Sequence, residues 1–264
     1  MATYQLADFL KHVSELSTIS PVAVELINKI SLPNTTRKDV ADLVAKDEIL
    51  YANIFKFVHS AAFPSARRPQ NLIQAIDLMG INEVRNLVFA IAARKAFVDL
   101  DLWFRSVFTA FAAQKFARAK EYSQDDVSNI YILGLMQSLG EQIFTTFYKQ
   151  ENEPVKEVKS FKEKLKLQKE IFGYTSLELS AEILKDFGLP DVIIELIEVQ
   201  KLSVDDEKFK EANVLIYTAA SLSELSEEKS TEEITAEDLE ECLDRDLLNK
   251  FSLTDLGINT SMFE

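Results

Sequence analysis

The chain has few residues of the kinds that sharp turns need. Its 264 residues include 6 glycines and 6 prolines. β-Sandwiches, barrels and propellers need a tight turn roughly every 8–12 residues, and glycine and proline supply much of that turn chemistry. Hydrophobic residues make up 47% of the chain and charged residues 27%, a mixture that forms a packed core. The composition therefore predicts an all-α protein whose helices are joined by a few connections with little glycine and proline.

Reactive side chains are also scarce. The chain contains one cysteine, Cys242, and two histidines, His12 and His59. A lone cysteine cannot form an internal disulfide, which is consistent with a reducing compartment. Neither histidine has a histidine or cysteine three or four residues away, the spacing that shares a helix face for metal ligation. No phosphate-binding glycine loop, dinucleotide fingerprint or G-x-S-x-G motif occurs, so we expect no cofactor.

Long apolar runs and clustered basic residues are missing as well. The longest apolar runs, such as 87–93 and 130–136, reach seven residues, whereas a bilayer-spanning helix needs about 20. The first residues lack a basic segment followed by an apolar one, so we expect no secretory signal and a cytoplasmic location. The formal net charge is −14, and residues 203–246 hold 15 acids against four bases. This charge argues against nucleic-acid and membrane partners, which both favour clustered Lys and Arg.

Helix start and stop signals are clear in the first 98 residues. Ser20 and Pro21 supply an N-cap and a first helical residue, while Thr36 and Asp39 form a variant of the capping box. Gly80 is typical of a left-handed helix end. These signals predict short helices over residues 21–30, 39–46, 47–60, 71–79 and 83–97. Most are too short to be stable alone, so their apolar faces must pack on one another.

A second helical region begins near Asp99. Aromatic residues recur along it at helical spacing and are predicted to be core: Trp103, Phe104, Phe108, Phe111 and Phe116. The next helix is expected from about residue 125 to residue 148. We therefore divide the chain into an N-terminal helical subdomain over 1–98, a helical bundle over 99–225 and an acidic C-terminal tail over 226–264.

The order of several motifs resembles that of a known family. The segments AIDLMG, DLWFRS, GLMQSLG, LELSAEIL and FGLPD follow one another as they do in the HDOD family, bacterial signal-output domains related to the HD phosphohydrolases. The resemblance covers about residues 15–225. It implies an all-α, multi-helical bundle like the HD phosphodiesterase domain, with an N-terminal helical subdomain.

The same resemblance locates a vestigial site. HD phosphohydrolases hold one or two metal ions with His and Asp side chains, and the metal activates water to attack a phosphate ester. In this chain the corresponding positions hold Arg105, Gln137, Ser138, Ser176, Gln200 and Lys201. Amides and hydroxyls supply no negative charge, and a guanidinium repels a cation. The resemblance therefore implies a pseudoenzyme with no metal and no catalytic residue. His59, where relatives commonly have Asn, is expected to serve structurally by donating a hydrogen bond to a helix end.

Three functions follow as hypotheses. The first is a non-catalytic module that binds a protein of a signalling pathway, which the family suggests could be a sensor kinase, a response regulator or a cyclic-di-GMP enzyme. For that partner we expect a docking cleft lined by Phe63, Arg67, Arg68 and Trp103. The second is a sensor that binds a nucleotide or another anion in the vestigial site. The third is a divergent metal-dependent phosphohydrolase that uses other ligands.

Overall fold

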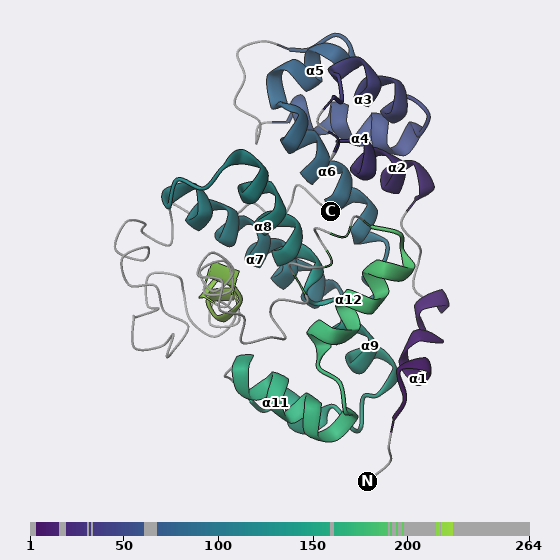
Figure 1. The fold of residues 1–264 in the computed structure, drawn as a ribbon, viewed down its shortest axis with the longest axis vertical. Helices are drawn as coiled ribbons and strands as arrows, with labels where there is room; N and C mark the ends of the chain where they lie inside the picture. The colour runs from purple at the N-terminus through teal and green to yellow at the C-terminus, as the bar shows by residue number, and fades with distance from the viewer. Residues whose placement is uncertain are drawn as a thin grey trace.

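The computed structural model describes residues 4–15, 20–30, 32, 34–60, 68–158 and 161–189, together with 191, 194, 197, 215, 216 and 218–223. These residues form helices and connections, and none of them lies in a strand (Figure 1). The predicted all-α class is confirmed. Within this part of the chain, no helix combines the length and the apolar character that crossing a membrane requires.

The first group of helices contains the elements α2 to α6. Their bounds are Pro21–Ile30 for α2, Arg37–Val44 for α3, Glu48–Val58 for α4, Leu72–Met79 for α5 and Ile81–Arg94 for α6. The helices pack on one another through small apolar faces. The hydroxyl of Ser20 accepts a hydrogen bond from the N–H of Ala23 at 3.2 Å, and Thr36 forms the capping box with Asp39, as the sequence predicts. These local signals set the helix starts.

Gly80 alone separates α5 from α6. Its φ of 86° and ψ of 151° lie in a region that favours glycine, and they turn the chain within one residue. The next helix therefore begins at Ile81. The predicted start of this helix at residue 83 is therefore two residues too late, and Asn82 lies inside its first turn.

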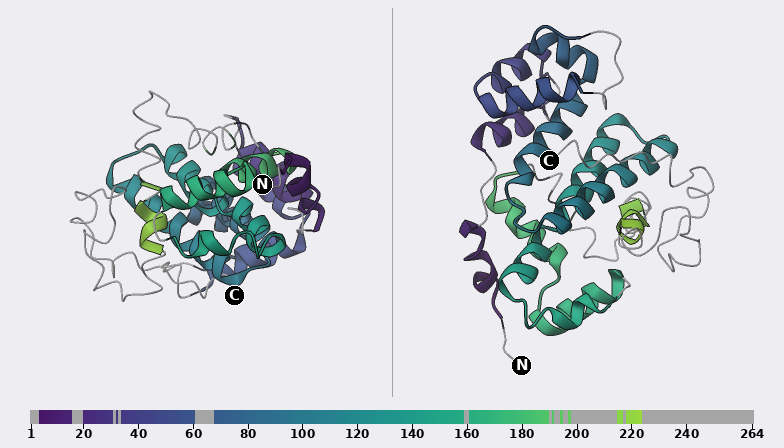
Figure 2. Two further views of the ribbon diagram at one scale, coloured as in Figure 1. Left: turned by 90° about the horizontal axis from the view of Figure 1, so that it is seen from below. Right: turned by 180° about the vertical axis from the view of Figure 1, so that it is seen from behind.

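The second group contains α7 to α12. Their bounds are Leu100–Ala119 for α7, Gln124–Met136 for α8, Leu139–Phe147 for α9, Glu153–Lys156 for α10, Phe161–Phe172 for α11 and Ser176–Asp186 for α12. Helices α7 and α8 form an antiparallel hairpin, and α9 packs on α12. The expected single helix over 125–148 is two helices, separated by a turn at Gln137 and Ser138. Helix α6 joins the two groups, because it packs on α2, α4 and α5 and also on α8 (Figure 2).

The first residues of the chain pack against the second group. Helix α1 (Leu6–Leu10) and the 3₁₀ turn η1 (Val13–Glu15) lie beside α9 and α12 (Figures 1 and 2). Phe9 is 1% exposed, and its ring is 5.6 Å from that of Phe144 and 5.7 Å from that of Tyr174. The hydroxyl of Tyr148 donates to the carbonyl of Asp8 at 2.8 Å. An aromatic cluster thus holds the N-terminal segment on the helical bundle.

Candidate functional site

The turn between α8 and α9 holds Gln137 and Ser138, two of the positions that the family resemblance identifies. Gln137 is 3% exposed, and its carbonyl accepts a hydrogen bond from the Ser180 hydroxyl at 2.7 Å. Its side-chain oxygen Oε1 is buried and has no hydrogen-bond partner among the described residues. Ser138 is half-buried and precedes the first residue of α9. The turn is therefore fixed through its backbone, while one polar side-chain atom in it is unsatisfied.

Helix α12 approaches this turn at very short range. The N–H of Gly140 donates to the Ser180 hydroxyl at 2.8 Å. A Cβ atom at Gly140 would lie 2.0 Å from the carbonyl oxygen of Ser176 and 2.7 Å from Cβ of Leu179. Only glycine permits this contact between α9 and the first turn of α12. Ser176 is thereby brought beside the α8–α9 turn, as the resemblance implies.

Arg105 lies on α7, the helix that packs against α8. A Cβ atom at Gly134 would lie 2.8 Å from Cα of Ala110, so α7 and α8 are also in close backbone contact. Because these two helices are antiparallel, Gln137, one turn beyond Gly134, is level with the turn of α7 that contains Arg105. Arg105 is half-buried, and its carbonyl accepts a hydrogen bond from Ser223 at 3.3 Å. The helices that carry the four described vestigial positions therefore pack on one another.

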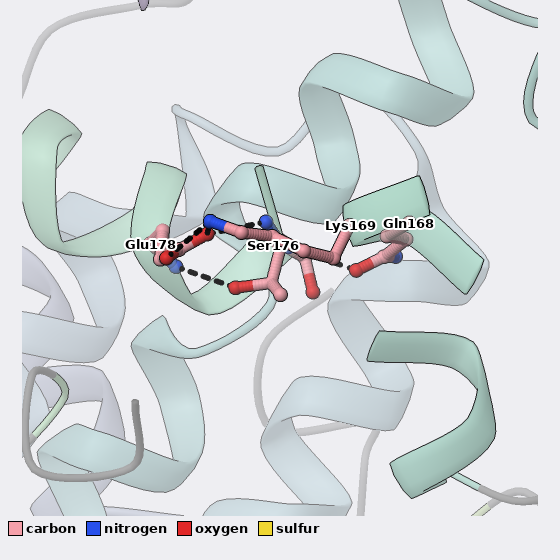
Figure 3. A network of polar contacts seen from close by, with 5 residues as sticks. Gln168, Lys169, Ser176 and Glu178 are labelled. Atoms are coloured by element: carbon pink, nitrogen blue, oxygen red, sulfur yellow. Dashed lines mark hydrogen bonds and ion pairs between the residues drawn. The ribbon is translucent and has the colours of Figure 1, made fainter. Parts of the chain in front are cut away.

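At the start of α12, side chains of α11 and of the N-terminal end of α12 itself form hydrogen bonds with the backbone and with one another (Figure 3). The N–H of Ser176 donates to Oε1 of Gln168 at 2.8 Å, and both residues are 2% exposed. Glu178 accepts a hydrogen bond from the N–H of Thr175 at 2.7 Å, and its N–H donates to the Thr175 hydroxyl at 3.1 Å. Lys169 reaches the two carboxylate oxygens of Glu178 at 2.8 and 3.0 Å. The polar groups named here at the start of α12 therefore already have hydrogen-bond partners within the protein.

The donors at these positions do not fit a catalytic metal ion. Arg105, Gln137, Ser138 and Ser176 offer a guanidinium, an amide and two hydroxyls, with neither an imidazole nor a carboxylate among them. Divalent ions in such sites are held by anionic carboxylates and neutral imidazoles. Within the ranges that the structure describes, no group of three or more His, Cys, Asp or Glu could hold a metal ion. We therefore assign no metal-dependent step to this site.

The expected docking cleft needs a correction. Trp103 is 0% exposed and packs beside Phe97, with the ring centroids 5.3 Å apart, so it cannot line a surface. Its place on the inner face of α7 follows from the apolar helical spacing that also predicts it to be core. Arg68 is exposed and donates to the carbonyl of His59 at the end of α4. The remaining predicted site residues, Phe63, Arg67, Gln200 and Lys201, lie outside the described residues.

Two residues of this region, Ser180 and Gln168, are not predicted from the sequence. Ser180 follows Ser176 by four residues on the same helix, a spacing that places both side chains on one face. That spacing is the signal that could have identified Ser180. Gln168 is among the lysines and glutamates of α11, and nothing in its surroundings marks it as buried.

Comparison with known proteins bears on the family and the fold. The family model described as HDOD domain matches residues 16–202. A crystal structure of an HDOD domain protein of unknown function from Geobacter sulfurreducens has a TM-score of 0.66 and 18% sequence identity, covering 98% of this chain and 90% of that one. A crystal structure from Shewanella amazonensis SB2B, provisionally named a phosphohydrolase, has a TM-score of 0.68 and 19% identity, covering 95% of this chain and 91% of that one.

Two further comparisons involve longer proteins. A structure from Marinobacter aquaeolei VT8, provisionally named a signal transduction protein, has a TM-score of 0.68 and 21% identity, covering all of this chain and 60% of that one. An uncharacterized protein of Treponema pallidum (strain Nichols) is 25% identical in an alignment of 147 residues that covers 54% of this chain. The match spans 28% of the length of that curated relative.

Proposed function

Because this chain belongs to the HDOD family, we propose that it is a non-catalytic signal-transduction module that acts in the cytoplasm by binding another protein. One observation carries the proposal: Arg105, Gln137, Ser138 and Ser176 include no His, Asp or Glu. These are the described residues that the family resemblance equates with the metal ligands of HD phosphohydrolases. Such a set of donors cannot activate water through a divalent ion. The scaffold then acts through its surfaces.

The hydrogen bonds of the site support the same proposal. Ser180 uses its hydroxyl for the backbone of the α8–α9 turn, and Gln168 uses its amide oxygen for the backbone of α12. These groups are engaged in holding helices together, where a catalytic site needs groups that face the substrate. A protein of a signalling pathway, such as a sensor kinase, a response regulator or a cyclic-di-GMP enzyme, is the partner class that we propose.

Two measurements test this function. The purified full chain is assayed with bis(p-nitrophenyl) phosphate and with cyclic dinucleotides in the presence of Mn²⁺, Mg²⁺ or Zn²⁺, with an active HD phosphohydrolase as the positive control. We expect no turnover above the rate of buffer, and turnover that EDTA abolishes would contradict the proposal. In parallel, binding to purified candidate partners from the same organism is measured by biolayer interferometry, and the proposal requires saturable binding to one of them.

A second candidate function rests on the side chain of Gln137. Its buried Oε1 lacks a partner among the described residues, and an unsatisfied buried acceptor costs about 1–3 kcal/mol. A nucleotide could donate a hydrogen bond to this atom if binding opens the buried site, which would make the chain a ligand sensor. Thermal-shift measurements against nucleotides and inorganic phosphate test this function. A rise in Tm that increases with ligand concentration and is lost in Gln137→Met would support it, and an unchanged Tm across the panel would exclude it.

A further inference from the structure

Helix α4 carries three stacked rings on its exposed side. The ring centroids of Tyr51 and Phe55 are 4.8 Å apart with an interplanar angle of 18°, and those of Phe55 and His59 are 5.7 Å apart with an angle of 16°. The spacing of four residues places all three rings on one face of the helix. Tyr51 is 41% exposed, His59 is exposed and Phe55 is half-buried. We call these three residues the α4 column.

Two cations flank the column at the C-terminal end of the helix. Lys56 lies in the last turn of α4 and is exposed. The guanidinium Nη1 of Arg68 donates to the carbonyl of His59 at 2.5 Å, which holds this side chain beside the last ring. Neither cation forms an ion pair with a residue that the structure describes, whereas Lys38 on the neighbouring helix α3 pairs with Asp42 at 3.3 Å. The column therefore ends in two positive charges that lack an acidic partner among the described residues.

The fold explains part of this arrangement. A cation near the C-terminus of a helix is stabilised by the helix dipole, and stacked rings four residues apart stabilise a helix slightly. His59 also serves the helix itself, since its Nδ1 lies 2.9 Å from the carbonyl of Phe55 and can donate to it. None of these effects requires Tyr51 to remain so exposed or Arg68 to be fixed beside the rings. Exposed aromatic rings beside arginine are the residue types that contribute most to the energy of protein interfaces.

We propose that the α4 column, together with Lys56 and Arg68, is the surface that binds an acidic segment of the partner protein. This inference rests on the proposed function and names its surface. The charge of the chain supports it, because the net charge is −14 while this end of α4 is locally basic. Complementary charge steers an acidic partner to this surface and disfavours a second copy of the same acidic chain.

The chemistry of the contact follows from the side chains. Apolar groups of the partner segment pack on the rings of Tyr51 and Phe55, and carboxylates pair with the ammonium of Lys56 and the guanidinium of Arg68. The planar guanidinium can hold a carboxylate through two parallel hydrogen bonds. Because Nδ1 of His59 faces the Phe55 carbonyl, Nε2 is the remaining polar atom of that ring for a partner group.

Site-specific photo-crosslinking tests the surface in the full chain. The variant Tyr51→p-benzoylphenylalanine is expressed in the native organism and irradiated. Val98→p-benzoylphenylalanine serves as the control, because Val98 is 63% exposed and lies in the connection between α6 and α7, away from α4. We expect position 51 to crosslink a protein through a segment rich in Asp and Glu. A crosslink to nucleic acid, to a neutral or basic segment, or to nothing overturns the inference. A protein crosslinked from position 98 alone overturns it while leaving the proposed function intact.

Binding of that segment, made as a synthetic peptide, completes the test. Lys56→Glu is expected to weaken the affinity about tenfold, which is the effect of losing about 1.4 kcal/mol of binding free energy. Lys38→Glu makes the same change of charge on α3 and should alter the affinity less than twofold. Arg68→Gln, whose folding is checked by circular dichroism because its guanidinium caps α4, should also weaken binding. Equal affinities of the wild type and Lys56→Glu would overturn the inference.

Discussion

The hydroxyl of Ser180 lies 2.7 Å from the carbonyl oxygen of Gln137 and donates a hydrogen bond to it, across 43 positions of the sequence. The same hydroxyl accepts from the N–H of Gly140 at 2.8 Å. In a continuous helix these two backbone groups would bond within the helix. One side chain of α12 thus takes over two helical hydrogen bonds and holds the turn that separates α8 from α9.

Replacing this hydroxyl gives the first prediction. Ser180→Ala leaves the N–H of Gly140 and one bond of the Gln137 carbonyl unsatisfied in a buried site. We expect a loss of about 1–3 kcal/mol in the free energy of unfolding, measured by urea denaturation. Ser138→Ala is the matched control, because the Ser138 side chain makes no capping bond to α9 and is half-buried. Equal stabilities of the two variants would show that the Ser180 bonds are unimportant.

The contact between α9 and α12 gives the second prediction. In Gly140→Ala, the new methyl group would meet the Ser176 carbonyl at 2.0 Å, and backbone cannot yield as a flexible side chain does. We expect a loss of more than about 3 kcal/mol, read as a large drop in Tm or failure to fold. Gly173→Ala separates this clash from ordinary glycine effects. Gly173 has a φ of +77° with open space around it, so we expect a smaller cost of about 1–2 kcal/mol there. Comparable Tm values for the two variants would argue against the close contact.

The features that the sequence predicts well are local ones. The caps Ser20 and Thr36 act over three residues and are predicted correctly, although the predicted start of α3 at residue 39 is two residues late. The all-α class follows from scarce turn residues. The break between α8 and α9 is different, because the residue that stabilises it, Ser180, is 40 positions from Gly140. No helix propensity near residue 137 contains that information. Long-range hydrogen bonds therefore limit what local patterns can predict.

In the candidate site, too, the sequence predicts some features and misses those that depend on long-range packing. The order of motifs identifies Gln137 and Ser176, and the structure brings their elements together at the Gly140 contact. The hydrogen bond from the N–H of Ser176 to Gln168 depends on how α11 packs against α12, and no sequence motif predicts that packing. Trp103 illustrates a different problem. Its place at the junction of the two helical regions suggests a docking residue, its helical spacing suggests core, and its complete burial decides for core.

The start of α12 gives a third prediction, which ranks two interactions. Thr175→Ala removes the N-cap, whose hydroxyl accepts from the N–H of Glu178, and should cost about 1 kcal/mol. Lys169→Gln removes the ion pair with Glu178, but the Lys169 side chain is 51% exposed, so we expect a cost below about 1 kcal/mol. Chemical denaturation at low and at high salt checks both values. Only the cost of Lys169→Gln should shrink with salt, and the reverse order of costs would contradict this interpretation.

The fourth prediction concerns acid pH and the capping box of α3. The hydroxyl of Thr36 donates to the carboxylate of Asp39 at 2.6 Å and its N–H donates at 2.9 Å, and these hydrogen bonds lower the pKa of Asp39 below its ordinary value of 3.8. A lowered pKa in the folded state means that Asp39 contributes stability above pH 3.8. This contribution is lost as the pH falls through the lower folded value.

Removal of the hydroxyl should therefore raise the pKa of Asp39. In Thr36→Val the backbone N–H of residue 36 still donates, so the pKa moves toward 3.8 without reaching it. NMR titration of the Asp39 carboxyl carbon measures this change directly, and Thr145→Val, which alters a hydroxyl on α9, should leave the titration unchanged. In Asp39→Asn, the free energy of unfolding measured with urea should lose the contribution of Asp39 to its pH dependence below pH 4. The reason is that Asn keeps an acceptor oxygen but cannot titrate. An Asp39 titration that is identical in the wild type and Thr36→Val would show that the hydroxyl does not stabilise the carboxylate.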